Sequence, residues 1–372
     1  MEFMFDIQEL IILLNNYCNL CCSYCCFKED KSEQFIECSI KHLEKAITLF
    51  FECIKFNPKS QRVLCFNADG ETLLSKKLLV NGIKFAAKLK KKFHGKNVIL
   101  AIVTNGTLID HYLASQFFRF GVSVTISIDG NAFTHDQHRV DKNNFPTHGK
   151  VINGIYHLKK FKVPFSVRAV ITPETALHIP ETYNFLKKLH PSRLVKLRPV
   201  RKKQYPLLPE KWVEVFTKNY TKCIKTLLLN GVDISEFPDD AYYFARFITQ
   251  GIPRQRYCGA GYNMLWMTPL GFFTSCGLFS NTDKILGHID MLSSAKDLCN
   301  LLEKPFASIF RSNSPQFNEP CMSCFWVDVC NGGCPALKIL SQKTREPPLL
   351  CEYYSTLGTM MESFYNLINF RR

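Results

Sequence analysis

Five cysteines lie within nine residues near the start of the chain, in the segment 18–26. Only Cys18, Cys22 and Cys25 show a gap of three residues followed by a gap of two. Three thiolates on one short loop suit an iron–sulfur cluster, which normally takes four Cys ligands, so one iron would stay open to an outside ligand. Zinc also binds cysteine-rich loops, although it prefers closed four-ligand sites, and the spacing alone leaves it as an alternative.

A second series of cysteines lies in the last third of the chain. The series runs Cys258, Cys276, Cys321, Cys324, Cys330, Cys334 and Cys351. The first residues include Glu2, Asp6 and Glu9 and predict no signal peptide, and no segment is apolar enough to span a membrane. We therefore expect a cytoplasmic protein, whose 17 reduced cysteines indicate metal or redox chemistry rather than disulfides.

The elements that position these cysteines alternate between strands and helices. The predicted strands are 7–14, 62–67, 97–103, 122–128, 164–171 and 193–200. The predicted helices are 39–56, 76–93, 110–120, 150–161 and 180–189. Six strands with five crossovers predict an α/β fold, either a doubly wound sheet or a partial (β/α)6 TIM-like barrel.

Polar or glycine-containing loops follow four of these strands. They are 15–27, 68–71, 104–107 and 129–130. Because the carboxyl ends of parallel strands share one rim, we expect these loops to converge with the first cysteine cluster and form a site.

The composition changes after Pro206, and two helices are predicted, at 209–229 and 238–250. A hairpin of 262–268 and 272–275 and a closing helix at 352–370 follow. We expect three domains: a barrel at 1–205, a helical connector at 206–257, and a small cysteine-rich α+β domain at 258–372.

The Cys-x3-Cys-x2-Cys motif, with Tyr24 before its last ligand, resembles that of radical S-adenosylmethionine (radical SAM) enzymes. Residues 68–72 stand where that family has Gly-Gly-Glu-Pro, so Gly70 and Glu71 match, whereas Asp69 and Thr72 depart. The resemblance implies a SAM-binding 4Fe-4S cluster on the three cysteines. It also implies that Glu71 and the backbone near Gly70 hold the methionyl amine.

The same resemblance assigns further contacts to SAM. Asn105 and Ser127 lie in the segments that match the signatures of the third and fourth strands. Arg168 matches an arginine of the fifth strand, whose guanidinium fork can pair with a carboxylate.

The second cysteine series resembles the SPASM domain, which carries two auxiliary 4Fe-4S clusters, so the resemblance implies three clusters in all. Cys321, Cys324, Cys330 and Cys351 would then bind the distal cluster, and Cys258, Cys276 and Cys334 the nearer one. A further cysteine often found in the family is replaced here by Met264, so the nearer cluster would have an open iron unless Cys299 or Cys223 supplies a ligand.

The resemblances predict a maturase that generates a 5′-deoxyadenosyl radical and modifies a peptide or protein side chain, by oxidation or by a thioether or carbon–carbon crosslink. Such an enzyme needs an electron donor such as flavodoxin or ferredoxin. The net charge of +15 favours an acidic peptide near Arg198, Arg201, Lys202 and Lys203.

Three other functions remain open. The first is a formylglycine-generating sulfatase maturase, although that branch has an Asp where this chain has Gly277. The second is a small-molecule radical SAM dehydrogenase. The third is a zinc-stabilised nucleic-acid-binding protein, which the six-strand pattern and the single cysteine register disfavour.

Overall fold

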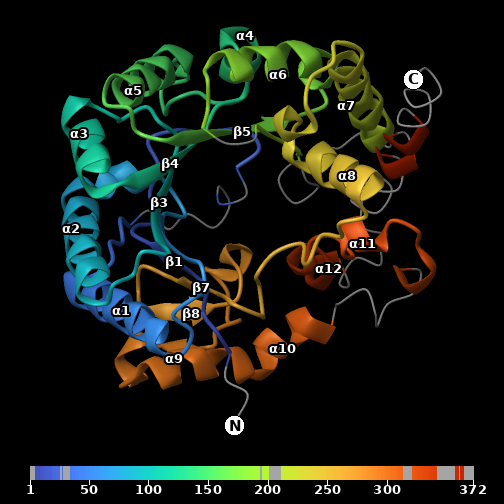
Figure 1. Ribbon diagram of the computed structural model, residues 1–372. Helices are drawn as coiled ribbons and strands as arrows, with labels where there is room; N and C mark the ends of the chain where they lie inside the picture. Colours follow the sequence, from blue (N-terminus) through green and yellow to red (C-terminus); the bar gives the residue numbers. More distant parts are fainter. Residues whose placement is uncertain are drawn as a thin grey trace. The chain divides into compact units, whose positions relative to one another are not determined.

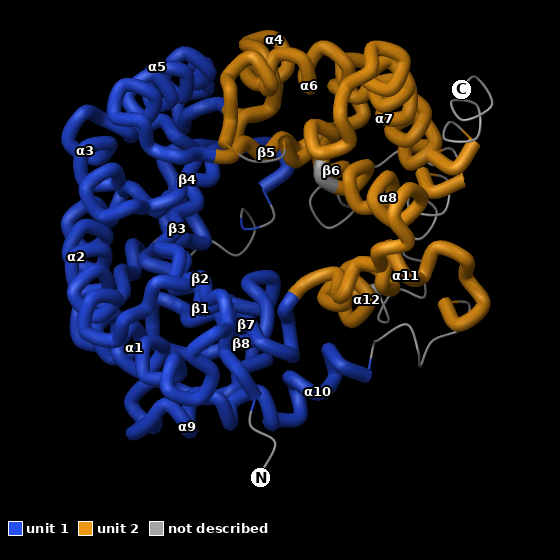
Figure 2. The backbone as a smooth tube through the Cα atoms, viewed as in Figure 1, with its two compact units in different colours: residues 1–126, 140–165, 259–312 blue, residues 127–139, 166–258, 313–372 orange. Residues whose placement is uncertain are grey.

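The computed structural model describes residues 5–25, 27, 34–192, 195–200, 211–312, 321–341, 357–359 and 361–363. These fall into two compact units, shown in Figure 2. Unit 1 comprises residues 1–126, 140–165 and 259–312, and unit 2 comprises residues 127–139, 166–258 and 313–372. Each unit is therefore built from segments that are distant in the sequence.

Unit 1 is organised around a sheet whose strands lie in the order β4-β3-β2-β1-β7-β8-β9. The strands are β1 Glu9–Leu13, β2 Arg62–Asn67, β3 Val98–Thr104, β4 Val122–Ser127, β7 Met264–Met267, β8 Phe272–Thr274 and β9 Gly287–His288. The neighbouring strands β4 and β3, β3 and β2, β2 and β1, and β1 and β7 run parallel. Strand β8 is antiparallel to both of its neighbours, β7 and β9. The C-terminal hairpin β7–β8 thus extends the sheet begun by the first strand.

Helices cover one face of the parallel strands in unit 1 (Figure 1). They are α1 Ile40–Glu52, α2 Lys76–Lys92, α3 His111–Phe120 and α5 His148–Lys160. Two of them begin with a side-chain cap: Ser39 accepts the N–H of His42, and Asp110 accepts the N–H of Leu113. The shorter helices α9 Ala295–Asn300 and α10 Pro305–Ser312 complete the unit.

The strands β2, β3 and β4 alternate strictly between buried and half-buried residues. The buried side chains face the helices, since a Cβ on Gly82 of α2 would come within 3.0 Å of the Phe66 ring. The half-buried residues, such as Cys65 and Ser123, must then occupy the other face, because successive side chains point to opposite faces. The residues on that second face are therefore more exposed than those beneath the helices.

Unit 2 contains a parallel pair of strands and a group of helices. The strands are β5 Phe165–Ile171, whose first residue lies in unit 1, and β6 Lys196–Pro199. The helices are α4 Ala132–Asp136, α6 Ile179–Lys188, α7 Trp212–Leu229, α8 Asp239–Gln250, α11 Val327–Cys330 and α12 Pro335–Ser341.

The predicted strands and helices up to residue 250, and the hairpin after it, are confirmed, with ends that differ by a few residues. Of the predicted closing helix, residues 357–359 and 361–363 are helical, and its other residues lie outside the described ones. The parallel pairing of β7 with β1 was not predicted.

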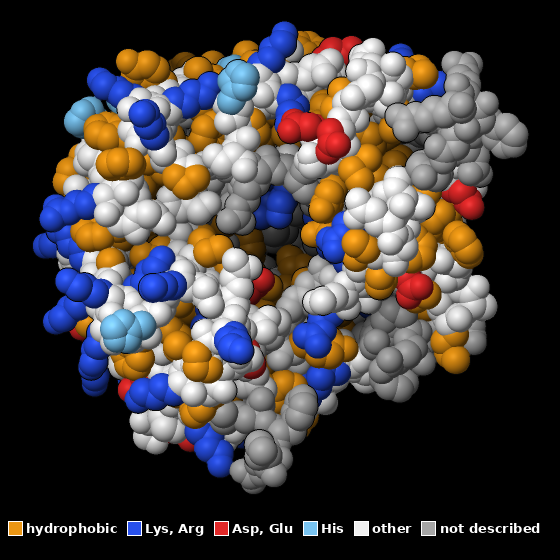
Figure 3. All heavy atoms as spheres, viewed as in Figure 1, with side chains coloured by type: hydrophobic (Ala, Val, Ile, Leu, Met, Phe, Trp, Pro, Cys, Tyr) orange, Lys and Arg blue, Asp and Glu red, His pale blue; other side chains and the backbone are white. Residues whose placement is uncertain are grey.

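The solvent side of α2 carries a row of positive charges. Exposed lysines recur along α2 at positions 77, 84, 88, 91 and 92. Figure 3 shows Lys and Arg side chains gathered along the edge that α2 forms. Among the described residues, no helix is long and apolar enough to cross a membrane.

Candidate functional site

The N-terminal cysteine loop begins where β1 ends, and Asn15 anchors it. The Asn15 side chain is fully buried, and its Nδ2 donates to the carbonyl oxygen of Glu71 at 3.0 Å and to Oγ of Ser75 at 2.9 Å. Its Oδ1 accepts the N–H of Tyr17 at 3.0 Å. The start of the loop is therefore tied to the segment that follows β2.

The cysteines of this loop differ in exposure. Cys18, Cys22 and Cys25 are half-buried, whereas Cys21 is exposed. The N–H of Leu20 points at Sγ of Cys18 at 3.4 Å, and such a donor stabilises a thiolate or a cluster sulfur. Three half-buried thiols on one loop, with a backbone donor to one sulfur, fit an iron–sulfur cluster.

Gly70 lies against the backbone of this loop. A Cβ at position 70 would lie 1.7 Å from the carbonyl oxygen of Tyr17. The next N–H, of Glu71, donates to that same oxygen at 2.6 Å. Glycine is therefore required at position 70 because the two loops touch through their backbones.

The carboxylate of Glu71 is buried and bonded within the protein. Its Oε1 accepts the N–H of Leu73 at 2.9 Å and the hydroxyl of Thr104 at 2.5 Å, and its Oε2 accepts the N–H of Asn105 at 2.7 Å. Burial raises the pKa of Glu71, and these hydrogen bonds oppose that shift. Glu71 thus holds together the loops that follow β2 and β3.

Asn105 extends this network to the cysteine loop. Its Nδ2 donates to Oδ1 of Asn19 at 2.9 Å and lies 4.0 Å from Sγ of Cys18. Its Oδ1 accepts both the N–H and the hydroxyl of Thr107, at 3.0 and 2.7 Å. Within unit 1, the structure therefore brings the loops after β1, β2 and β3 together, as the sequence predicts. Tyr24, in the same cysteine loop, is buried.

Ser127 and Arg168 belong to unit 2. Ser127 is half-buried at the end of β4. Arg168 is exposed on β5 between the buried residues Val167 and Ala169, and its carbonyl oxygen accepts the N–H of Ile128 at 3.0 Å.

Two further carboxylates, Asp129 and Asp240, are bound within unit 2. Asp129 accepts Nε of Arg139 at 2.8 Å and the N–H of Val170 at 2.9 Å. Asp240 is fully buried and accepts the Arg198 guanidinium at 2.8 and 2.9 Å. Both carboxylates are committed to the fold, and the charge of Arg198 is compensated. Arg201, Lys202 and Lys203 lie outside the described residues.

The C-terminal cysteines are divided between the units: Cys276 belongs to unit 1, and the other described members to unit 2. Cys321 begins a short 3-10 turn, Cys330 ends α11, and Cys334 directly precedes α12. Nζ of Lys338 lies 3.9 Å from Sγ of Cys321. Cys351 lies outside the described residues.

The remaining sulfur atoms near this series have other surroundings. Sδ of Met264 accepts Nε1 of Trp266 at 3.2 Å. Sγ of Cys299 lies 3.8 Å from Sγ of Cys53, and both side chains are buried. Burial raises the pKa of Cys223 to about 12. Cys299 and Cys223 therefore behave as core residues.

Gly277 packs against an aromatic ring. A Cβ at this position would come within 2.8 Å of the Trp266 indole. The contact explains why glycine follows Cys276, since a carboxylate side chain at position 277 would have to displace the indole.

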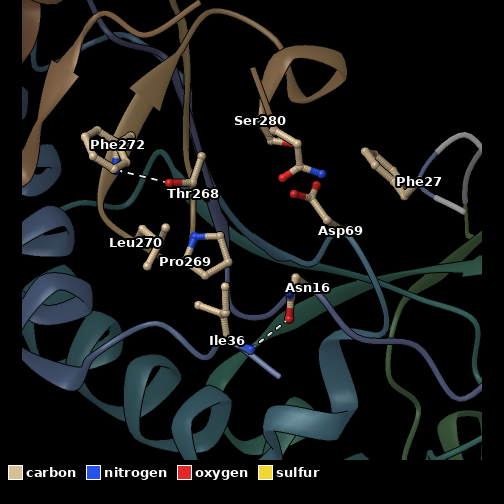
Figure 4. Close-up of a pocket in the computed structure, with 10 residues that line it drawn as sticks. Asn16, Phe27, Ile36, Asp69, Thr268, Pro269, Leu270, Phe272 and Ser280 are labelled. Carbon is tan, nitrogen blue, oxygen red and sulfur yellow. Dashed lines mark hydrogen bonds between the residues drawn. The ribbon is translucent and has the colours of Figure 1, made fainter. Parts of the chain in front are cut away.

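A pocket of about 210 Å³ opens beside these elements within unit 1 (Figure 4). It is lined by Asn16, Phe27, Ile36, Asp69, Thr268, Pro269, Leu270, Phe272, Ser280 and Asn281. Figure 4 shows the Asp69 carboxylate between Phe27 and Ser280. Only Asp69 carries an ionisable carboxylate among the lining residues, and its exposed fraction is 3%.

This pocket could not be predicted from the sequence because its walls come from two segments about 200 residues apart, 16–69 and 268–281. The only local signal was the carboxylate of Asp69, which stands where the family motif has glycine. The parallel pairing of β1 with β7 brings the remaining lining segments together.

Comparison with protein families shows that residues 12–186 match the model of the radical SAM superfamily. The serine-type anaerobic sulfatase-maturating enzyme of Klebsiella aerogenes is 26% identical over 332 residues, 86% of this chain and 77% of the relative. The cysteine-type enzyme of Clostridium novyi strain NT is 25% identical over 352 residues, 89% of this chain and 88% of the relative.

Solved structures agree with this likeness. The structure of anSMEcpe with bound AdoMet and the Cp18Cys peptide has a TM-score of 0.76 at 22% identity, covering 98% of this chain and 99% of that one. Streptococcus suis SuiB bound to its precursor peptide SuiA has a TM-score of 0.64 at 16% identity, covering 90% and 74%. The predicted fold class, a partial (β/α)6 barrel followed by a small cysteine-rich domain, is confirmed.

Proposed function

Because residues 12–186 of this chain match the radical SAM superfamily, we propose that the protein cleaves S-adenosylmethionine and modifies a side chain of a peptide or protein. The observation that carries the proposal is the half-buried Cys18, Cys22 and Cys25 loop, held by the hydrogen bonds of Glu71 and Asn105. A reduced cluster with bound SAM supplies a 5′-deoxyadenosyl radical that abstracts a substrate hydrogen atom.

The residues around the cluster would have distinct roles. Cys18, Cys22 and Cys25 would hold three irons, while Glu71 and Asn105 position their loop. Ser127 would contact SAM through its hydroxyl, and Arg168 would bind the cofactor carboxylate with its guanidinium fork. Gly70 contributes by allowing the contact with Tyr17.

The second cysteine series would hold two auxiliary 4Fe-4S clusters. Cys321, Cys324, Cys330 and Cys351 are assigned to one, and Cys258, Cys276 and Cys334 to the other. The Lys338 ammonium supports the first assignment, because it lies 3.9 Å from Sγ of Cys321 and can donate a hydrogen bond to a ligand sulfur. The engagement of Met264 with Trp266 supports an open iron in the second.

The pocket beside Asp69 is the place we assign to the substrate side chain. A two-electron oxidation removes one hydrogen atom and then one proton and one electron from the substrate. Asp69 is the carboxylate that lines this pocket, so the proton would go to Asp69. The electron would pass to an auxiliary cluster.

The names of the curated relatives favour one second candidate, a sulfatase maturase that forms formylglycine. Gly277 beneath Trp266 leaves no room for the aspartate that the resemblance places there. We therefore favour a peptide-modifying reaction that does not need a carboxylate at position 277. The reaction would be an oxidation or the formation of a crosslink.

The proposal includes a cytoplasmic setting and a flavodoxin or ferredoxin as electron donor. A peptide substrate agrees with the peptides bound in the two solved structures. An acidic peptide would suit the net charge of +15, although Arg198 is already paired with Asp240.

The test is an anaerobic reconstitution followed by iron and sulfide analysis. Incubation with dithionite and SAM should then yield 5′-deoxyadenosine, and we expect roughly eight to twelve irons per chain, as two or three four-iron clusters require. Zinc in place of iron, without cleavage, would refute the proposal and return the zinc-stabilised nucleic-acid-binding alternative. Peptides carrying the serine-type or cysteine-type sulfatase sequence test the second candidate directly.

A further inference from the structure

Three metal-ligating side chains, none of them a cysteine, meet in unit 1 where α1 approaches β9. His42 lies in the first turn of α1, His288 ends β9, and Asp290 follows in the 3-10 turn Ile289–Met291. One ligand atom from each of these residues lies within 4.8 Å of the others. The two histidines are half-buried, and the Asp290 side chain is 52% exposed.

The hydrogen bond of His288 determines which of its ring nitrogens can bind a metal. Nε2 lies 2.9 Å from the carbonyl oxygen of Leu270. Because a carbonyl only accepts, Nε2 carries the hydrogen and Nδ1 keeps its lone pair. Nδ1 lies 3.6 Å from Oδ2 of Asp290 and accepts the N–H of Asp290 over 3.2 Å. Metal-bound histidines characteristically donate their second N–H to a carbonyl or carboxylate in this way.

His42 approaches the same carboxylate from the helix. Its Nε2 lies 3.4 Å from Oδ1 of Asp290. Its Nδ1 is buried and has no hydrogen-bond partner among the described residues. Lys45 also contacts Asp290, but its Nζ donates to the backbone carbonyl oxygen at 3.3 Å and not to the carboxylate.

These separations agree with those of a small tetrahedral ion. Ligand atoms about 2.1 Å from zinc lie about 3.4 Å from one another in a tetrahedron. The distance from Oδ1 of Asp290 to Nε2 of His42 is 3.4 Å and that from Oδ2 to Nδ1 of His288 is 3.6 Å, both close to that value, and one ligand atom of each residue lies within 4.8 Å of the others. The exposed side of Asp290 leaves room for water as a fourth ligand.

We propose that His42, His288 and Asp290 form a binding site for Zn²⁺, separate from the cysteines that would hold iron. Two imidazoles and one carboxylate are a common ligand set for zinc with one open position. With the ion bound, Nδ1 of His288 binds the metal in place of its long contact with the N–H of Asp290. The ion would then link α1 to the β8–β9 pair.

Such an ion would act on the pocket wall through the Leu270 carbonyl. Leu270 and Pro269 line the pocket, and Leu270 is held by the ring of His288. Gly271 adjoins them with φ +90°, and a Cβ there would lie 2.9 Å from Nδ1 of His42 and 3.0 Å from Nε2 of His288. Glycine at this position lets the two rings close around Asp290.

The test uses the iron-loaded holoenzyme, titrated with Zn²⁺ by calorimetry, with the zinc environment read by X-ray absorption. We expect one additional zinc per chain, bound by nitrogen and oxygen with imidazole scattering. Asp290→Asn should weaken this binding at least about 10-fold. The matched control is Asp283→Asn, because the Asp283 carboxylate is exposed and lies 3.8 Å from Nζ of Lys284. It should bind zinc as the parent does.

His288→Ala adds a second variant, and an unchanged iron content shows that each variant is folded. Sulfur ligands around the zinc, equal affinity in the parent and Asp290→Asn, or no binding would each overturn the proposal. The outcome is independent of SAM cleavage, so the zinc site and the proposed enzyme activity can fail separately.

Discussion

The carboxylate of Glu71 accepts the backbone N–H of Asn105 at 2.7 Å and thereby joins the loops that follow β2 and β3. Since Asn105 in turn bonds Asn19 of the cysteine loop, three loops depend on one buried acid. Glu71 acts on the cluster loop through these neighbours, as a positioning residue.

Replacing Glu71 by Gln should destabilise the protein by about 1–3 kcal/mol, because the amide nitrogen cannot accept the N–H groups that the carboxylate accepts. Burial raises the pKa of Glu71 above its ordinary value of 4.5, so folding favours its protonated form. The contribution of the raised pKa to the free energy of unfolding is fully present below pH 4.5, and it is lost as the pH rises through the pKa of Glu71 in the folded protein. The stability gap between the parent and Glu71→Gln should therefore narrow as the pH rises above 4.5 in denaturant titrations. A widening gap would contradict the assignment.

Gly70→Ala should prevent the cysteine loop from forming. The new Cβ would lie 1.7 Å from the Tyr17 carbonyl oxygen, and the backbone there cannot move without displacing the loop. We expect a loss of several kcal/mol, beyond the usual 1–3 kcal/mol of overpacking, together with loss of iron on reconstitution. Gly149→Ala is the control, because nothing lies within 4 Å of a Cβ at that helical position. Normal iron content in Gly70→Ala would show that the contact is dispensable.

Gly277→Asp should lower stability and should not create sulfatase-maturing activity. The side chain would meet the Trp266 indole at 2.8 Å, so we expect a cost of roughly 1–3 kcal/mol. Thermal unfolding measures the cost, and sulfatase peptides measure the activity. Gly149→Asp serves as the matched control because its site is open. Formylglycine produced by Gly277→Asp alone would contradict this prediction.

Asp69→Asn should separate the two halves of the proposed reaction. SAM cleavage should stay within about twofold of the parent, whereas modified substrate should fall by about 10² or more, the usual effect of removing a general base. The ratio of product to 5′-deoxyadenosine, measured in one reaction, reports this uncoupling. Ser280→Ala changes the same pocket without removing a carboxylate and should keep the ratio. An unchanged ratio in Asp69→Asn would remove Asp69 from the mechanism.

Asp240→Ala should strongly destabilise unit 2. It leaves the Arg198 guanidinium without the carboxylate that it contacts at 2.8 and 2.9 Å, and breaking a buried pair costs roughly 3–5 kcal/mol. Because Arg198 is 24% exposed, we expect the lower end of that range. Asp283→Ala, at an exposed carboxylate, should change stability by less than about 0.5 kcal/mol. Equal melting temperatures for the two variants would refute the prediction.

Local patterns predicted the repeating part of this fold well. Alternation of apolar runs with amphipathic stretches located the six strands, because each strand buries one face beneath helices. Loop order along the chain then predicted that the segments after β1, β2 and β3 meet, and the bonds of Asn15 and Asn105 confirm it.

Contacts between distant segments were beyond such patterns. The approach of Gly277 to Trp266 depends on how the turn after Cys276 folds back on β7. The ion pair between Asp129 and Arg139 could not be predicted either, because the sequence shows a carboxylate but not its partner. Residue types therefore indicated the chemistry, whereas tertiary packing decides which acids are available for it.

The pairing of β1 with β7 has a consequence for synthesis on the ribosome. Gln8 and Asn263, which bond side chain to side chain at the start of this pair, are separated by 255 positions. Because the ribosome adds about 5–20 residues per second, β7 is synthesised roughly 10–50 s after β1. During that interval one edge of β1 is open to pairing with other chains. The nascent protein is therefore most prone to aggregate before β7 emerges, and chaperone binding should be concentrated in that window.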